Sequence, residues 1–154
     1  MNKYSLTVHS GSRGFAAKVF EYHHKKALLN VNHIGYLENE DLYEYLFDMM
    51  VAQYYALLNR EIIIRAIEKE LKIVHSNDFI STVHNYINPN DFIIRKGAIA
   101  NYDNKCIITL NMKDGVLIVH GKSNKDWNYS APHGAGRILY KIRRLSKYNA
   151  RSVF

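Results

Sequence analysis

The sequence predicts an α+β protein in which a long amphipathic helix packs on a small, mainly antiparallel sheet. Helical periodicity dominates the first half of the chain, whereas short apolar runs separated by Asn, Asp and Gly fill the second half. The 154 residues suffice for a single domain over residues 1–154, and the apolar fraction of 47% excludes a disordered chain. We therefore expect one domain with one hydrophobic core.

The first half is predicted to be mainly helical. The longest helix is the clearest prediction, because its apolar positions recur every three or four residues and its charges match the helix dipole. Glu40 and Asp41 lie near its start, and Lys72 lies at its end. We expect a strand over residues 4–9, a helix over residues 15–29, a loop over residues 30–39 and a helix over residues 40–72.

The second half is predicted to form short strands, because its apolar runs are brief and turn residues interrupt them. A last helical pattern follows, with Ile138, Ile142 and Leu145 on its inner face. We expect strands over residues 79–87, 92–95, 106–110 and 116–120, and a final helix over residues 136–148.

The excess positive charge is local. The chain carries 21 Lys and Arg against 14 Asp and Glu, a net charge of +7. Residues 1–120 hold 13 of each sign, whereas residues 121–154 hold 8 basic residues and only Asp126. Such a block attracts polyanions, among which nucleic acid is the commonest. A solvated basic segment is the alternative interpretation.

The composition also indicates where in the cell the protein is located. No apolar run reaches the ~18 residues that a membrane span needs, and residues 1–5 lack the features of a signal peptide. Cys106 is the single cysteine, which excludes an internal disulfide framework. We expect a cytoplasmic protein without a membrane partner.

Two glycine-rich segments share one design, HSGSRG at residues 9–14 and SAPHGAGR at residues 130–137. Glycine lets backbone N–H groups approach an anion, and the start of a helix adds partial positive charge. Each segment pairs an arginine that can clamp a phosphate with a histidine that can bind metal or act as a nucleophile, namely Arg13 with His9 and Arg137 with His133. An anion site and an ordinary structural turn remain equally good interpretations.

Histidine spacing reveals no metal site. The eight histidines form no His-x-x-x-His pattern, and Cys-x-x-Cys is absent, so a closed zinc site is not expected. His23 and His24 lie on a predicted helix and are expected at the surface. His84, beside Asn85, is either an ordinary hydrogen-bonded side chain or a ligand contact.

Several short motifs follow one another along nearly the whole chain. They are HSGSRG at 9–14, DM at 48–49, AQ at 52–53, YA at 55–56, NR at 59–60, HNY at 84–86, RKGA at 95–98, LNMKDG at 110–115 and DWNYSAPHGAGR at 126–137. In this order they resemble the RtcB-type RNA-splicing ligases, which join RNA ends using GTP and manganese. The last motif is highly specific, and the resemblance implies that the chain forms part of an RtcB-like ligase fold.

The resemblance implies a chemical role for His133. In such ligases the histidine of the His-Gly-Ala-Gly-Arg segment attacks the α-phosphate of GTP and carries GMP as a phosphoramidate. GMP then passes to an RNA 3′-phosphate, and a 5′-hydroxyl displaces it to form the phosphodiester. An end that is a 2′,3′-cyclic phosphate is first opened to the 3′-phosphate.

The same resemblance implies binding roles for further residues. His9 and His84 match manganese ligands, and Arg13, Lys96 and Arg137 match positions for RNA phosphate or pyrophosphate. The residues that match guanylate-contacting positions are His84, Asn85, Thr109, Leu110, Asn111, Met112, Val116, His133, Gly134, Ala135 and Gly136.

The resemblance covers the central and late part of such ligases, with both ends missing. Family members carry upstream Asp-x-Gly-Cys and Gly-Asn-His segments that supply further metal ligands, and guanine-contacting residues near their C-terminus. Thr109 stands where a proline is usual, and Val116 stands where a serine often contacts the nucleotide. Two histidines are too few for tight manganese binding, so we expect a second chain to supply the missing ligands.

Three functional hypotheses follow. The first is a GTP- and manganese-dependent RNA ligase module of tRNA splicing or RNA repair: a remnant, a truncated reading frame or one half of a split enzyme. The second is a non-catalytic remnant that binds RNA or a nucleotide. The third is an inactive fragment that exposes apolar surface.

Overall fold

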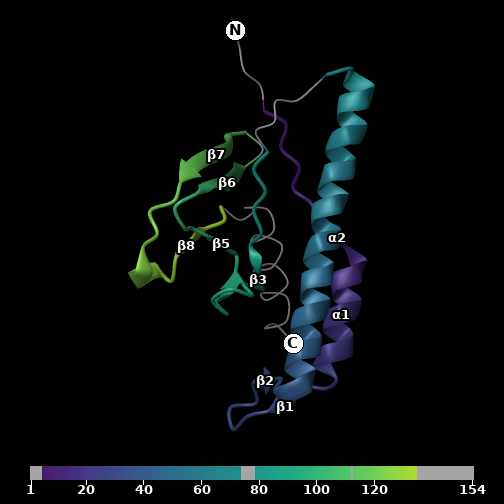
Figure 1. The fold of residues 1–154 in the computed structure, drawn as a ribbon, viewed down its shortest axis with the longest axis vertical. Helices are drawn as coiled ribbons and strands as arrows, with labels where there is room; N and C mark the ends of the chain where they lie inside the picture. Colours follow the sequence, from purple (N-terminus) through teal and green to yellow (C-terminus); the bar gives the residue numbers. More distant parts are fainter. Residues whose placement is uncertain (1–4, 74–78, 112, 135–154) are drawn as a thin grey trace, which may run out of the picture. The chain divides into compact units, whose positions relative to one another are not determined.

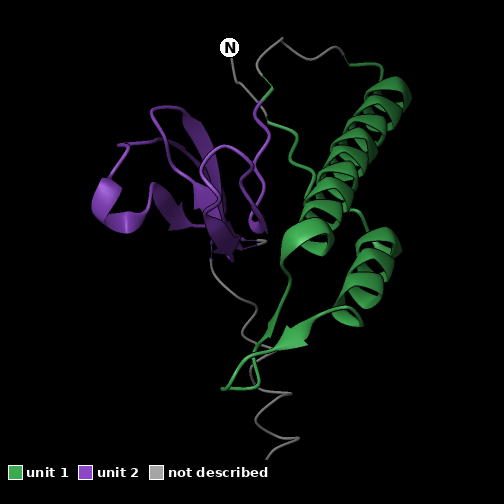
Figure 2. Cartoon of the chain, turned by 60° about the horizontal axis from the view of Figure 1, so that its bottom comes forward, with its two compact units in different colours: residues 1–79 green, residues 80–154 purple. Residues whose placement is uncertain are grey.

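The chain folds into two compact units, Met1–Phe79 and Ile80–Phe154, shown in different colours in Figure 2. The computed structural model describes residues 5–73, 79–111 and 113–134, so the predicted helix over residues 136–148 lies outside the described residues. In the described ranges the long helices belong to the first unit, and most of the strands belong to the second (Figure 1). The prediction of an α+β fold with small antiparallel sheets is confirmed.

Two helices, α1 (Gly14–His24) and α2 (Asn39–Leu71), form most of the first unit and pack against each other. Met49, Ala52 and Ala56 of α2 are buried, and His23 of α1 lies 2.9 Å from Asp48 of α2. Lys72 ends α2 in a left-handed conformation, and its N–H bonds to carbonyls of the last turn. The helix predicted over residues 40–72 is confirmed. Although α2 is long, none of the described helices is apolar enough to cross a membrane.

The helix predicted over residues 15–29 is too long, because α1 stops at His24. Leu28 and Leu29 instead form β1 (Leu28–Leu29), which pairs antiparallel with β2 (Gly35–Tyr36) inside the predicted loop. The turn between them is fixed by the Asn30 side chain, which accepts hydrogen bonds from two backbone N–H groups. Asn30 thus stabilises the β1–β2 turn, and Leu28 and Leu29 pair with β2 instead of extending the helix.

The second unit is built from antiparallel strand pairs. Strand β3 pairs with β4, β5 with β8, and β6 with β7. The bounds are β3 (Asn85–Ile87), β4 (Ile94–Lys96), β5 (Ala98–Ala100), β6 (Lys105–Asn111), β7 (Gly115–His120) and β8 (Ser130–Pro132), with a short 3₁₀ helix, η1 (Lys125–Trp127), before β8. Ile99 and Cys106 are buried in this unit, and so is the charged side chain of Arg95.

Prediction of these strands was partly right. The hairpin β6–β7 matches the strands predicted over residues 106–110 and 116–120. The strand predicted over residues 79–87 is reduced to its last three residues, and residues 5–9 form no strand. Strands β5 and β8 were not predicted, because three residues are too few to establish a period of two.

Candidate functional site

The second unit brings His84 and His133 together at Gly97. The β3–β4 register places Asn85 opposite Lys96, and the β5–β8 register places Ala98 opposite Pro132. Gly97 lies between β4 and β5, directly after Lys96 and directly before Ala98. His84 directly precedes Asn85 and His133 directly follows Pro132, so the two pairings place both histidines beside Gly97. Their rings stack with centroids 4.3 Å apart and planes tilted by 28°.

The backbone of Gly97 bonds to both sides. Its N–H donates to the His84 carbonyl at 2.8 Å and to the Asn85 Oδ1 at 3.0 Å. Its carbonyl accepts from the His133 N–H at 3.3 Å and faces the His133 Nδ1 at 3.2 Å. Gly97 has φ of +65°, a conformation that residues with a Cβ rarely adopt. One glycine in the left-handed region therefore links the two histidines.

The contact with Gly97 fixes which nitrogen of His133 is available. A carbonyl oxygen can only accept a hydrogen bond, so Nδ1 must carry the proton that it donates. In the neutral imidazole Nε2 then has a free lone pair. The residue is partly buried and its ring stacks on that of His84. His133 is thus held in the tautomer that suits a nucleophile attacking through Nε2.

The backbone after His133 is fixed by Thr109. Thr109 donates to the His133 carbonyl through its N–H at 3.1 Å and through its Oγ1 at 3.0 Å. Gly134 follows with φ of +134°, and a Cβ placed on it would lie 1.7 Å from the Thr109 carbonyl oxygen. Only glycine fits here, so the glycine after the histidine is a steric requirement of the fold.

The first glycine-rich segment is supported differently, by side chains of α2. Asn59 Nδ2 donates to Ser10 Oγ at 3.0 Å and to the Gly11 carbonyl at 3.2 Å. Arg60 donates to the Ser10 carbonyl at 3.0 Å, and burial lowers the pKa of this guanidinium. The segment opens α1 as predicted, and exposed Arg13 precedes the helix with φ of 54°.

Comparison with known proteins identifies the family. The model of the tRNA-splicing ligase RtcB matches residues 1–153. The chain belongs to the RtcB ligase family. The RNA-splicing ligase RtcB2 of Escherichia coli is 28% identical over 156 residues, which is 94% of this chain and 40% of that relative. The chain therefore spans less than half the length of this relative. No solved structure matches the chain.

The remaining RtcB-like positions lie partly in the β6–β7 hairpin. Asn111 closes the hairpin turn, since its Oδ1 accepts from the N–H groups of Lys113 and Asp114 and its Nδ2 donates to Asp114. Leu110 lies beside it on β6, Val116 pairs with Thr109, and Lys96 is exposed on β4. Met112, Ala135, Gly136 and Arg137 lie outside the described residues.

A metal centre does not form from the described residues alone. In residues 5–73, 79–111 and 113–134, no three His, Cys, Asp or Glu side chains gather as metal ligands would. His9 belongs to the first unit and His84 to the second. These residues do not fit a complete manganese site, and the pairing of His9 with His84 on one ion stays a prediction.

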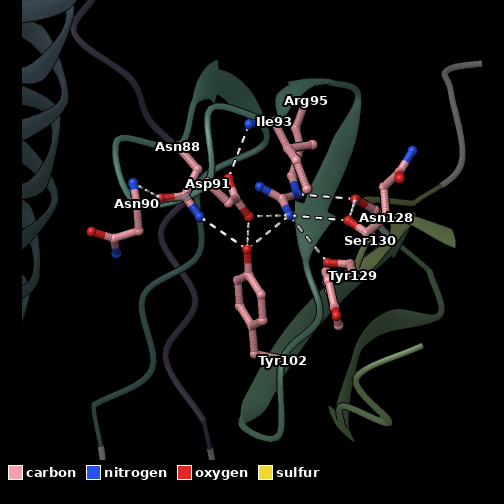
Figure 3. A network of polar contacts seen from close by, with 9 residues as sticks. All are labelled: Asn88, Asn90, Asp91, Ile93, Arg95, Tyr102, Asn128, Tyr129 and Ser130. Atoms are coloured by element: carbon pink, nitrogen blue, oxygen red, sulfur yellow. Dashed lines mark hydrogen bonds and ion pairs between the residues drawn. The ribbon is translucent and has the colours of Figure 1, made fainter. Parts of the chain in front are cut away.

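Sequence reasoning missed two buried polar groups. His23 was expected at the surface but is 2% exposed, with its Nε2 2.9 Å from Asp48 Oδ2; His24 is exposed as expected. Arg95 is likewise 2% exposed and lies at the centre of the polar network in Figure 3. Its position in the RtcB-like RKGA motif was visible in the sequence, but its burial was not, because arginine is rarely buried.

Proposed function

We propose that this chain is the nucleophile-bearing part of a GTP-dependent RNA ligase and that His133 accepts GMP through Nε2. One observation carries the proposal: the Gly97 carbonyl accepts a hydrogen bond from the Nδ1–H of His133, which leaves Nε2 as the basic nitrogen. Family membership supports the reaction class, since the related Escherichia coli protein is named as an RNA-splicing ligase.

The first step forms a phosphoramidate. The Nε2 lone pair attacks the α-phosphorus of GTP, the bond to the β-phosphate oxygen breaks, and pyrophosphate leaves. The backbone of Gly97 and Thr109 keeps the ring and the His133 carbonyl in place during this step, so little reorganisation is needed. Exposed Lys96 next to Gly97 supplies positive charge for the phosphates.

The second half of the reaction releases the histidine. An oxygen of the RNA 3′-phosphate attacks the GMP phosphorus, and the P–N bond breaks. A 5′-hydroxyl then attacks the activated 3′-phosphate, loses its proton and displaces GMP. RNA with a 3′-phosphate or a 2′,3′-cyclic phosphate is accordingly the proposed substrate, in tRNA splicing or RNA repair.

Manganese is proposed as the metal of the family, with His9 and His84 as two of its ligands. When bound, such an ion would neutralise phosphate charge. Two histidines are too few for tight binding, so we propose that a second chain supplies the remaining ligands.

The test is covalent labelling of the full chain with GTP radiolabelled at the α-phosphate, in the presence of manganese. We expect label that survives SDS and is released by acid, because P–N bonds are acid-labile. The label should disappear in His133→Ala and persist in His120→Ala, a control histidine exposed on β7.

Three outcomes decide between the hypotheses. Label that persists in His133→Ala would refute the assignment of the nucleophile. Absence of label with salt-sensitive RNA binding retained would favour the non-catalytic RNA-binding protein. Label that appears only after addition of a polypeptide carrying an Asp-x-Gly-Cys segment would identify this chain as one part of a split ligase.

A further inference from the structure

Arg95 holds three consecutive residues that lead into His133. Its Nη2 donates to the carbonyls of Asn128 at 3.2 Å and Tyr129 at 3.3 Å, and its Nε donates to Ser130 Oγ at 3.0 Å (Figure 3). The side chain is only 1% exposed, so these bonds form away from competing water. A single guanidinium thus fixes the turn that precedes β8.

The turn needs such support because its backbone is strained. Asn128 and Tyr129 both have φ of 48°, the left-handed region that residues other than glycine seldom enter. The carbonyl oxygens of these same two residues are the acceptors of Arg95 Nη2. Strained backbone persists only where its surroundings hold it, and the bonds from Arg95 do so here.

The same Nη2 nitrogen also contacts Asp91, in the β3–β4 turn, and Tyr102, between β5 and β6. Asp91 Oδ2 lies 3.5 Å from Nη2 and balances its charge, and Tyr102 OH lies 3.3 Å from it and also bonds to Asp91. The rings of Tyr86 and Tyr102 lie 5.8 and 5.6 Å from the guanidinium carbon. Arg95 therefore ties the turn before β8 to the hairpin that follows His84.

The anchored turn determines where His133 lies. Ser130 is the first residue of β8 and pairs with Ala100, and the register continues to Pro132 opposite Ala98. His133 follows directly and meets the Gly97 carbonyl. Because a strand three residues long has few bonds of its own, its register depends on the residue at its start.

We propose that Arg95 is a positioning residue for His133: by clamping residues 128–130 it keeps the Nδ1–H of His133 on the Gly97 carbonyl and Nε2 free. Arg95 acts through the strand and does not touch the nucleotide. The catalytic consequence rests on the proposed function, whereas the effect on the His133 tautomer does not.

The test compares variants of the full chain at three residues of the network. Ser130→Ala removes the bond from Arg95 Nε and the bond that Ser130 Oγ donates to the Asn128 carbonyl. Tyr102→Phe removes the bonds of the Tyr102 hydroxyl while keeping the ring that stacks on Tyr129. Arg95→Lys removes the bidentate geometry altogether. The measurement is the ¹⁵N chemical shift of the His133 imidazole, assigned by comparison with His133→Ala, together with urea unfolding of each variant.

We expect the wild type and Tyr102→Phe to hold the Nδ1–H tautomer. In Ser130→Ala and Arg95→Lys the ratio of Nδ1–H to Nε2–H forms should fall about fivefold, the loss that one hydrogen bond implies. A purely structural Arg95 would lower stability in all three variants and leave the tautomer unchanged, and that result would overturn the proposal. An equal tautomer change in Tyr102→Phe would overturn it as well.

The two proposals can fail separately. If Arg95→Lys does not fold, Ser130→Ala still decides the positioning role. A wild type that takes no label from GTP refutes the ligase chemistry and leaves the tautomer measurement valid. If the wild type is labelled, Arg95→Lys should lower the labelling rate at saturating GTP about fivefold, with little change in the GTP concentration at half-maximal rate.

Discussion

The two glycine-rich segments have similar composition but are supported in opposite ways. In the first unit, residues 9–14 are held by the side chains of Asn59 and Arg60, and a Cβ on Gly11 would meet nothing within 4 Å. In the second unit, His133 is held by the backbone of Gly97 and Thr109 and by the Thr109 hydroxyl, and Gly134 has no room for a Cβ. Similar composition therefore gives one tolerant turn and one sterically fixed turn, and the fixed turn sets the tautomer of His133.

Alanine at the two glycines should give the largest contrast. Gly134→Ala forces a contact with the Thr109 carbonyl, so we expect a loss of about 3 kcal/mol or more in the free energy of unfolding of the second unit. Gly11→Ala should change the first unit by about 0.5 kcal/mol or less. Urea unfolding measures both, with fluorescence of the single tryptophan, Trp127, for the second unit and far-UV circular dichroism for the helices. Equal losses of stability in Gly134→Ala and Gly11→Ala would contradict the difference in steric room between the two glycines.

The adjacent histidines of α1 offer the next contrast, within the first unit. Asp48→Ala leaves the buried His23 imidazole without its carboxylate partner, so we expect a loss of about 1–3 kcal/mol in stability. His24→Ala, at an exposed neighbour, should cost less than about 0.5 kcal/mol. Thermal unfolding followed by circular dichroism measures both. A loss in His24→Ala as large as that in Asp48→Ala would contradict the buried pair.

Asn59→Ala tests the side-chain support of residues 9–14. It removes two hydrogen bonds to Ser10 and Gly11, partly offset by the higher helix propensity of alanine, so we expect a net loss of about 1 kcal/mol. Amide hydrogen exchange of residues 9–14 should accelerate, whereas the exposed control Lys69→Ala should leave it unchanged. Unchanged exchange in Asn59→Ala would show that the segment does not depend on α2.

The smallest effect is a pH dependence in the second unit. Burial raises the pKa of the Cys106 thiol above its usual value. The unfolded chain therefore loses this proton first, so the thiol's contribution to stability is full below about pH 8.5 and declines as pH rises toward the folded pKa. Urea unfolding at rising pH should show a shallower decline in Cys106→Ala than in the wild type. Parallel curves would show that the thiol is not desolvated.

Much of the fold was predictable because its signals are local. The long helix α2 shows its period over many turns, and the β6–β7 hairpin is marked by apolar runs around a glycine turn. The end of α1 was not predictable from periodicity, because the apolar residues Leu28 and Leu29 continue the pattern but pair with β2 instead. Strands β5 and β8 were missed because each is defined by its partner rather than by its own pattern.

Part of the candidate site was likewise predictable from the sequence, and part was not. Motif resemblance located His133, His84 and the glycine after His133, and the structure brings the two histidines together at Gly97. The roles of Thr109 and Arg95 as supports could not be read from the sequence, since they depend on contacts between segments distant along the chain. The proposed manganese ligands and the guanylate contacts remain predictions.

By itself the sequence determined the family, the long helix and the residue types available for phosphoryl transfer, because these depend on local pattern and motif order. Only the tertiary structure decided which imidazole nitrogen of His133 is free, why Gly134 must be glycine and why an arginine is buried. The reason is physical: a proton position, an excluded Cβ and a desolvated charge are each set by atoms that reach the same place from distant parts of the chain.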